Sequence, residues 1–272
     1  MLRVTEIGME YYEKFFGVKY PFTKYDQIFL PEFRIGGMEN AGCVTYNDVF
    51  IKPANEMTDA LRFRLAYITL HELAHMWFGD LVTMHWWNDL WLKESFADFM
   101  ALMCLTECKA ELMQVPMKGH IYANPEVYNT KFIDNALNLD VKRSVTHPIQ
   151  VQVKHTIDAV NVFDGICYEK GASFIKTLKN YIGKDALKEG VSYYFQKFRF
   201  QNTLTQDFID CLQTAILAYP HLADKNLRAW ADSWISKAGV NEIEPIVTSD
   251  GTRFTVSLRQ RVPRHGDPVL HE

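Results

Sequence analysis

Apolar and polar residues along this chain recur mainly with the spacing of an amphipathic helix, in which every third or fourth side chain is apolar. From residue 109 to about 155 the pattern is shorter and is interrupted by prolines, which indicates several short helices. Elsewhere the pattern predicts longer helices at residues 4–16, 158–182, 184–200, 204–218 and 224–238. The chain is therefore expected to be mostly α-helical.

Residues 58–78 differ from these segments because they are apolar on nearly every side, which is typical of a buried helix. Thr58 or Asp59 can cap its start, and Gly79 is expected to end it. A polar group inside such a helix needs a hydrogen bond or a metal ion, because an unpartnered buried polar group is unfavourable.

Strands are predicted where β-branched and aromatic residues alternate with polar ones, at residues 25–31 and 43–51. Near the C-terminus, residues 243–248 and 253–258 predict a β-hairpin around the turn Ser249-Asp250-Gly251. A small sheet is thus expected beside the helices, which makes the fold class α+β.

The pattern changes from helix to strand near Gly239, and we place a domain boundary there. Residues 1–239 would form one domain and residues 240–272 the first strands of another. A chain of 272 residues is long enough for one to two domains.

Composition and charge exclude several classes of protein. The hydrophobic content of 48% is that of a globular protein, and the net charge of −4 without a long basic tract gives no reason to expect nucleic-acid binding. No apolar run approaches the roughly 18 residues of a membrane span, and the N-terminus lacks the pattern of a signal peptide.

The five cysteines, which are odd in number and widely scattered, do not predict a disulfide framework. Unpaired cysteines and the missing signal favour a cytoplasmic location. A segment preceding Met1 could still carry a signal or an anchor.

The clearest chemistry lies in the predicted buried helix, at His71-Glu72-Leu73-Ala74-His75. Two histidines four positions apart project from one helix face and can hold a metal ion. Neutral imidazoles suit Zn²⁺, which lowers the pKa of a bound water to about 7. Glu72 is turned partly off the ligand face and can act on that water as a general base. Core histidines bonded to the backbone are the alternative, but three such residues in five positions would be unusual.

Glu94 is the expected third ligand, since it follows His75 after 18 intervening residues in a helix that continues to about Cys108. Three protein ligands and an open fourth position are typical of a catalytic zinc. Asp98, one turn later, could orient a ligand by a hydrogen bond or could lie on a solvated helix face. His85 lies outside this spacing and is not counted as a ligand.

The segment Gly36-Gly37-Met38-Glu39-Asn40 lies between the two predicted strands. Paired glycines permit a backbone that passes close to a ligand and leaves its amide and carbonyl groups free for strand-like pairing. A simple hairpin turn is the alternative from spacing alone.

Together, Gly-Gly-Met-Glu-Asn, His-Glu-Leu-Ala-His and the later Glu94 resemble the gluzincin aminopeptidases of the aminopeptidase N type. The tract from Trp77 to Ala97, including Trp-Phe-Gly-Asp-Leu-Val-Thr, resembles the same branch. The resemblance implies a thermolysin-like catalytic domain, mostly helical with a small mixed sheet, followed by the start of a β-sandwich. It also implies one zinc ion and hydrolysis of the N-terminal residue from peptide substrates.

The same resemblance implies roles for further residues. Tyr168, in Tyr-Glu-Lys-Gly-Ala, would donate a hydrogen bond to the oxyanion of the tetrahedral intermediate, and Glu39 would pair with the free α-ammonium of the substrate. Gly36, Gly37, Met38 and Asn40 complete the implied substrate-binding segment, whose backbone would align the peptide. We expect Glu169 and Lys170, next to Tyr168, to be charges on the helix surface.

Two departures from the family stand out. Lys93 precedes the ligand glutamate, where the family commonly has asparagine, and this change affects the electrostatics of the site. The N-terminal β-domain and the large C-terminal helical domain of the relatives are outside this sequence, so a full-length protein is expected to carry additional domains at both ends.

Three alternatives remain open. A thermolysin-type endopeptidase is disfavoured by Gly-Met-Glu-Asn. A relative of aminopeptidase B or leukotriene A4 hydrolase shares the glycine at position 37 but is disfavoured by the Glu-Ser-Phe-Ala context of Glu94. A non-catalytic binding module on the same fold is the third, and the presence of every expected catalytic side chain argues against it.

Overall fold

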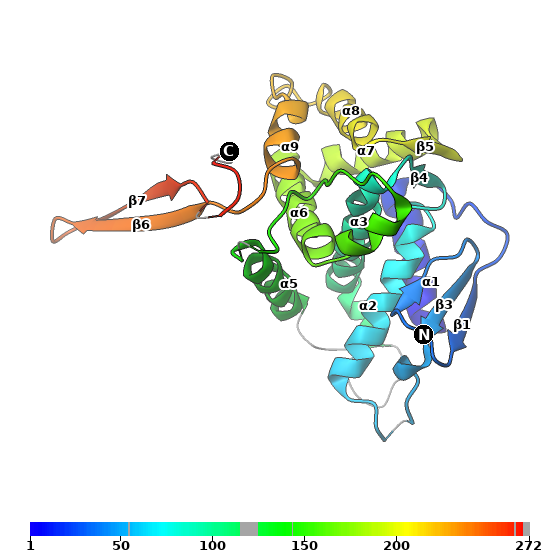
Figure 1. The fold of residues 1–272 in the computed structure, drawn as a ribbon. Helices are drawn as coiled ribbons and strands as arrows, with labels where there is room; N and C mark the ends of the chain where they lie inside the picture. The colour runs from blue at the N-terminus through cyan, green and yellow to red at the C-terminus, as the bar shows by residue number, and fades with distance from the viewer. Residues whose placement is uncertain (54, 115–124, 143, 264, 269–272) are drawn as a thin grey trace.

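The computed structural model describes residues 1–53, 55–114, 125–142, 144–263 and 265–268 (Figure 1). These residues form a helical body with a small sheet on one side and a two-stranded hairpin on the other. The α-helices are Leu2–Phe16 (α1), Asp59–His75 (α2), Leu90–Glu107 (α3), Lys109–Met113 (α4), Pro125–Asp140 (α5), Gly171–Ile182 (α6), Lys184–Lys197 (α7), Thr205–Ile216 (α8) and Leu227–Ile235 (α9). About half of the chain is helical and small sheets lie beside the helices, which agrees with the predicted α+β class, whereas the predicted β-sandwich is not confirmed.

Helices α2 and α3 pack against each other at the centre of the helical body. Phe78 stacks on Phe96 with ring centroids 3.8 Å apart, and both side chains are fully buried. Helix α1 covers one side of α2, where the Tyr12 hydroxyl donates to the Leu70 carbonyl at 3.0 Å. The polar side chains that project between α2 and α3 are therefore held on two tightly packed supports.

Helix α2 begins where the sequence predicts, since the Thr58 hydroxyl accepts a hydrogen bond from the Leu61 amide. It ends at His75, before the expected stop at Gly79, because the His75 carbonyl accepts from the Asp80 amide and the chain turns. Its first half is also less buried than predicted: only its last turns, from Thr69 to His75, are buried on every side.

The small mixed sheet has the strand order β1-β3-β2. Its strands are Asp26–Leu30 (β1), Gly37–Met38 (β2) and Cys43–Asn47 (β3), with a 3₁₀ turn at Asp48–Phe50. Strand β1 runs parallel to β3, and β2 runs antiparallel to it. Strand β2 is therefore an edge strand, and it approaches α2 on the side that carries Glu72.

A second, parallel pair joins Val82–Met84 (β4) to Gln201–Thr203 (β5), and the sequence did not predict it. The sequence pattern predicted only a break between two helices at residues 202 and 203. Next to this pairing, Thr205 Oγ1 at the start of α8 donates to Asp89 Oδ1 at 2.6 Å. The two contacts together hold the segment between α2 and α3 against α8. A 3₁₀ turn at Trp87–Asp89 then leads directly into α3.

The helix expected over residues 158–182 is interrupted. A 3₁₀ segment covers Thr156–Val162, a π-helical turn covers Ile166–Lys170, and α6 follows from Gly171. The break arises because Asp164 Oδ1 accepts hydrogen bonds from the amides of Ile166 and Cys167, in place of backbone carbonyls one turn earlier. A π-helical turn often accompanies a functional site, and this one contains Tyr168.

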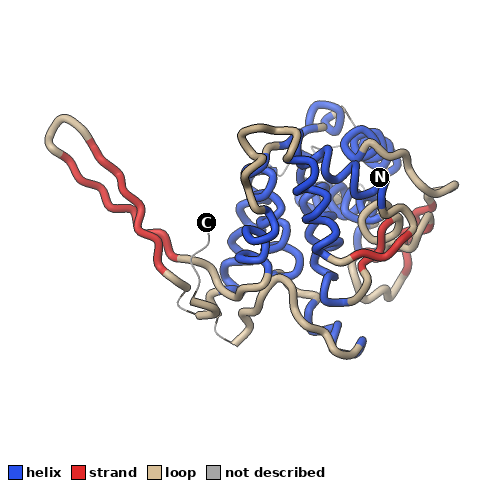
Figure 2. Tube along the Cα trace, turned by 90° about the horizontal axis from the view of Figure 1, so that it is seen from above, coloured by secondary structure: helices blue, strands red, loops and turns tan. Residues whose placement is uncertain are grey.

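The predicted C-terminal hairpin is present as Glu242–Ser249 (β6) and Phe254–Arg261 (β7), paired in antiparallel register throughout. Both views show it projecting away from the helical body (Figures 1 and 2). Among the described residues, no helix is long and apolar enough to cross a membrane. All five cysteines are free.

Candidate metal centre

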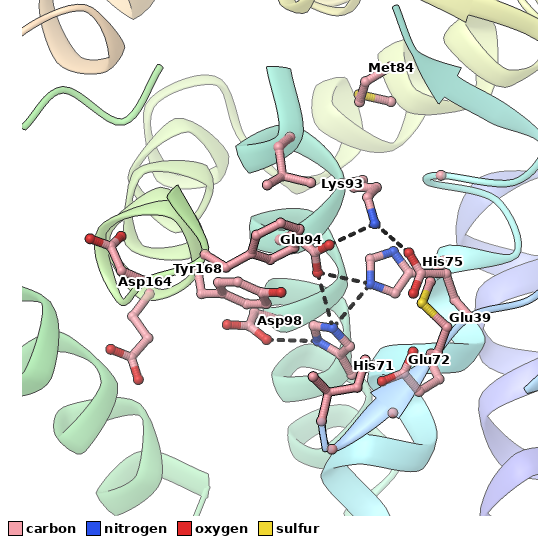
Figure 3. Close-up of a pocket in the computed structure, with 18 of the residues that line it drawn as sticks. Glu39, His71, Glu72, His75, Met84, Lys93, Glu94, Asp98, Asp164 and Tyr168 are labelled. Atoms are coloured by element: carbon pink, nitrogen blue, oxygen red, sulfur yellow. Dashed lines mark hydrogen bonds and ion pairs between the residues drawn. The ribbon is translucent and has the colours of Figure 1, made fainter. Parts of the chain in front are cut away.

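Three potential ligand atoms meet between α2 and α3. His71 and His75, one turn apart on α2, point their Nε2 atoms toward Glu94 on α3 (Figure 3). The two Nε2 atoms are 3.1 Å apart, and Glu94 Oε2 lies 3.2 Å from His75 Nε2 and 3.6 Å from His71 Nε2. All three side chains are buried. The structure thus brings together the three ligands that the sequence predicts.

The orientation of each imidazole is set by its other nitrogen. His75 Nδ1 lies 2.9 Å from the Phe78 carbonyl oxygen, and His71 Nδ1 lies 2.7 Å from Asp98 Oδ1. Because a carbonyl and a carboxylate only accept, both Nδ1 atoms carry a proton, and the Nε2 atoms are the ones left to bind a metal. Asp98 is itself held by a hydrogen bond from the Tyr67 hydroxyl, so it faces His71 and does not lie on a solvated surface.

This donor set fits one zinc ion. Two imidazole lone pairs and a carboxylate oxygen facing one another repel unless a cation or a proton lies between them. Ligand atoms at the zinc bond lengths of about 2.0–2.2 Å in a tetrahedral arrangement are about 3.4 Å apart, close to the three separations observed here. The residues therefore match a three-ligand zinc site with its fourth side open to the cavity.

Glu72 is turned off the ligand face toward the sheet, as expected. Its side chain packs on Gly37, where an added Cβ would lie 2.1 Å from Glu72 Oε1. Its Oε2 atom is buried and has no hydrogen-bond partner among the described residues. Burial raises the pKa of Glu72 to about 7, against the opposing effect of the two histidines. A carboxylate with a free oxygen and a raised pKa is suited to accept a proton at neutral pH.

Gly37 therefore has a second role, which the sequence did not reveal. The glycine was expected to bring the backbone close to a ligand, and it also leaves room for the Glu72 carboxylate. Residues 35–39 line the cavity along the edge strand β2. Asn40 is exposed instead, and its amide nitrogen lies 3.3 Å from Thr45 Oγ1 on β3.

Glu39 is buried at the end of this segment and is only 8% exposed. One atom each of Glu39, Glu72 and His75 lie within 4.8 Å of one another, so the two glutamates flank the ligand group. Burial would raise the pKa of Glu39, but the charges of His75 and Lys93 outweigh burial and lower it. Glu39 is thus an anion that faces the cavity beside the predicted ligands.

The ammonium of Lys93 bridges two carboxylates. Its Nζ lies 2.7 Å from Glu94 Oε1 and also contacts Glu39 Oε1 (Figure 3). Burial alone would lower the pKa of Lys93, but the charges of Glu94 and Glu39 raise it above its usual value. Lys93 is therefore a fixed cation within the site.

Tyr168 lies on the opposite side of the ligand group from Glu39 (Figure 3). Its ring stacks on His71 with centroids 6.2 Å apart and an interplanar angle of 17°. Burial, followed by the nearby charge of Glu94, raises its pKa far above the usual range. The phenol is thus a neutral donor. Asp164 supports its π-helical turn and accepts a hydrogen bond from His147 at 2.8 Å.

The two residues that follow Tyr168 are not simple surface charges, so that expectation is corrected. Lys170 is buried, and its Nζ lies 2.6 Å from Asp140 Oδ2. Glu169 lines the cavity, and burial raises its pKa to about 7. The π-helical turn directs these side chains inward, and a regular helix pattern could not have indicated this.

One cavity of about 1160 Å³ is lined by the three predicted ligands and by Glu39, Glu72, Lys93, Tyr168 and Glu169. Its lining also includes the exposed His85 and apolar residues that the sequence reading did not single out. Among the latter are Met84, Trp86, Trp87, Leu90 and Phe163. A cavity of this size can admit a peptide segment along the edge strand β2.

Comparison with known proteins agrees with this geometry. Residues 1–234 match the peptidase family M1 domain. The chain is 37% identical to aminopeptidase N of Streptomyces lividans, over 99% of this chain and 30% of that protein. It is 37% identical to aminopeptidase 2, mitochondrial, of Saccharomyces cerevisiae (91% and 24%) and 32% identical to glutamyl aminopeptidase of Mus musculus (97% and 26%). The chain thus spans less than a third of the length of each of these relatives.

Proposed function

Because this chain belongs to peptidase family M1, we propose that it is the catalytic segment of a zinc-dependent aminopeptidase, which removes the N-terminal residue from peptides. The convergence of His71, His75 and Glu94 between two packed helices, with the free Glu72 oxygen beside them, carries this proposal. The names of the relatives, which include aminopeptidase N, agree with it.

His71, His75 and Glu94 would hold one Zn²⁺, which when bound polarises the scissile carbonyl and acidifies water. Glu72 accepts a proton from the attacking water at Oε2 and delivers it to the nitrogen of the leaving amine. Burial raises the pKa of Glu72, and burial thus favours the protonated form that delivers the proton to the leaving amine. Gly37 keeps the carboxylate in this position by leaving space for it.

Tyr168 donates a hydrogen bond to the oxygen that develops negative charge during attack. Its raised pKa keeps the proton on the phenol, so it acts as a donor at any physiological pH. The stacking of its ring on His71 places the hydroxyl on the side of the ligand group that faces away from Glu39. The carbonyl of the first residue would lie between the two.

Glu39 would bind the α-ammonium of the substrate, which restricts cleavage to the first peptide bond. An internal peptide segment brings no α-ammonium to this buried carboxylate and so gains no charge-assisted hydrogen bond there. The free edge of strand β2 offers the backbone groups of Gly36, Gly37 and Met38 for pairing with an extended peptide.

The remainder of the relatives suggests what else a complete protein contains. We propose that residues 1–239 are the catalytic domain and that residues 240–272 begin a β-sandwich whose further strands would cover the hairpin. Additional domains on either side would narrow the cavity and shape the pocket for the first side chain. The substrates would be peptides with a free N-terminus.

The test measures bound zinc and peptide hydrolysis on the same purified sample. Substrates are a leucyl amide and its N-acetylated counterpart, and Glu72→Gln is compared with the exposed Glu10→Gln as a matched control. We expect one zinc ion per chain in all samples and hydrolysis of the free-amine substrate only. Glu72→Gln should lower kcat by about 10²- to 10⁴-fold without loss of zinc.

Several outcomes count against the proposal. A chain that binds no zinc would refute the metal centre, and equal hydrolysis of both substrates would refute the exopeptidase assignment. An active Glu72→Gln variant would refute the role of Glu72. Zinc binding without any turnover would indicate a binding module on the same fold.

A further inference from the structure

Lys93 occupies the place that an incoming amine would need. Its Nζ is bonded to Glu39, the carboxylate assigned to the substrate α-ammonium, and lies 2.7 Å from Glu94 Oε1. The Glu94 oxygen that it contacts is Oε1, whereas Oε2 faces the two histidines. The ammonium therefore stays outside the ligand group while it neutralises both carboxylates.

The position of this ammonium is built into the fold. Adjacent residues on a helix project about 100° apart, so the side chains of Lys93 and Glu94 would ordinarily diverge. The stem of Lys93 instead passes Gly79, where an added Cβ would lie 3.3 Å from Lys93 Cδ. Gly79 has a φ of +125°, which suits glycine and leaves this path open. The side chain is only 17% exposed, so few alternative positions remain for it.

A lysine ammonium and a peptide α-ammonium are the same chemical group, and both seek charge-assisted hydrogen bonds from a carboxylate. We propose that Lys93 is a specificity-determining residue that acts as a resident competitor for the amine subsite at Glu39. This inference rests on the proposed aminopeptidase function and deepens it. A substrate amine must share or displace the lysine ammonium, so Lys93 weakens amine binding and sets its strength.

The Lys93 ammonium also acts on the metal centre. Lys93 attracts Glu94 Oε1 away from the ligand group and lowers the negative potential there. Removal of the lysine charge should therefore leave zinc affinity unchanged or increase it. A residue that merely supported Glu94 would have the opposite effect, because its loss would disorder a ligand.

The experiment measures binding of a primary amine that cannot be hydrolysed. L-leucinol, with N-acetyl-L-leucinol as the blocked counterpart, is titrated into the zinc-loaded 272-residue chain by calorimetry. The variants are Lys93→Gln, Lys93→Asn, Lys93→Arg and Glu39→Gln, and the exposed Lys14→Gln is the matched control for loss of one lysine charge. Zinc content is measured for every variant.

We expect Lys93→Gln and Lys93→Asn to bind L-leucinol about tenfold or more tightly than the wild type, with zinc retained. Lys93→Arg and Lys14→Gln should stay near the wild-type affinity. The blocked compound should show no difference among the Lys93 variants. Unchanged or weaker amine binding in both neutral Lys93 variants would overturn the proposal.

A measurement on the wild type covers the case in which the neutral variants do not fold. The lysine side chains are labelled with ¹⁵N, and the Lys93 resonance is assigned by its absence in Lys93→Arg. L-leucinol should shift the Lys93 ¹⁵Nζ resonance, whereas N-acetyl-L-leucinol should not. A resonance that stays unmoved at saturation would contradict displacement.

Failure of this inference can be told apart from failure of the proposed function. If Glu39→Gln abolishes amine binding while Lys93→Gln resembles the wild type, only the competitor role fails. If Glu39→Gln binds L-leucinol as well as the wild type does, the amine subsite itself is absent and the proposed exopeptidase fails with it.

Discussion

The interior between α2 and α3 and the hairpin β6–β7 differ in which kind of side chain is buried and which is exposed. Between the helices, polar groups are buried: His75 is 1% exposed and Glu94 is 4% exposed. On the hairpin, apolar side chains are open to solvent: Phe254 is 80% exposed and Leu258 is 71% exposed. One region has taken polar groups out of water, and the other has left apolar groups in it.

The two regions therefore differ in how far contacts within this chain satisfy polar side chains and cover apolar ones. Most buried polar side chains at the metal centre have a partner from the same chain or belong to the group that fits a cation, and Glu72, which lines the cavity, is an exception. The hairpin has no such closure, because its strand pairing puts Pro245, Val247, Val256, Leu258 and Phe254 on one face. An isolated two-stranded hairpin is only marginally stable in water, so we expect another segment or protein to pack on this face.

The largest test of this comparison removes a ligand. Glu94→Ala should weaken zinc binding by more than about 100-fold, because loss of a residue that merely supports a ligand already costs 10- to 100-fold. Amide hydrogen exchange should then accelerate in the last turns of α2 and in α3, while the hairpin exchanges as before. Zinc titration and hydrogen exchange check both effects. Equal acceleration in the hairpin would show that the two regions are coupled.

A second test compares a buried ion pair with an exposed one. Lys170 and Asp140 are almost fully buried, and Lys170 also donates to the Gly239 carbonyl at 3.1 Å. Lys170→Ala leaves Asp140 as an uncompensated buried charge and should cost about 3–5 kcal/mol of stability. Arg261→Ala breaks the exposed pair with Glu244 on the hairpin and should cost at most about 1 kcal/mol. Urea unfolding of both variants measures the difference, and similar costs would contradict it.

The metal centre was predictable from the sequence because its chemistry depends on local spacing. His71, Glu72 and His75 need only one regular helix to take their positions, and α2 supplies it. Glu94 needs the packing of α3 on α2, which spacing alone does not give. The resemblance to a known family supplied that step, and it also supplied the assignments of Glu39 and Tyr168.

What escaped prediction depends on contacts between distant segments. Strands β4 and β5 have three residues each, too few to show a period, and they form only because the two segments meet. The interruption before Tyr168 depends on the Asp164 carboxylate, which replaces backbone acceptors for two amides. The sequence placed Lys93 near the site but did not predict its contact with Glu39, because that contact depends on the space beside Gly79.

The smallest expected effect on stability comes from the open face of the hairpin. Phe254→Ser replaces a side chain that is 80% exposed, so the free energy of unfolding should change by no more than about 0.5 kcal/mol. Self-association at high concentration should fall, since an exposed apolar face favours contact between copies. Thr255→Ser, on the other face of β7, is the matched control. Sedimentation velocity and urea unfolding check both expectations. A loss of more than about 1.5 kcal/mol would mean that Phe254 already packs within this chain, and the contrast between the two regions would then fail at the hairpin.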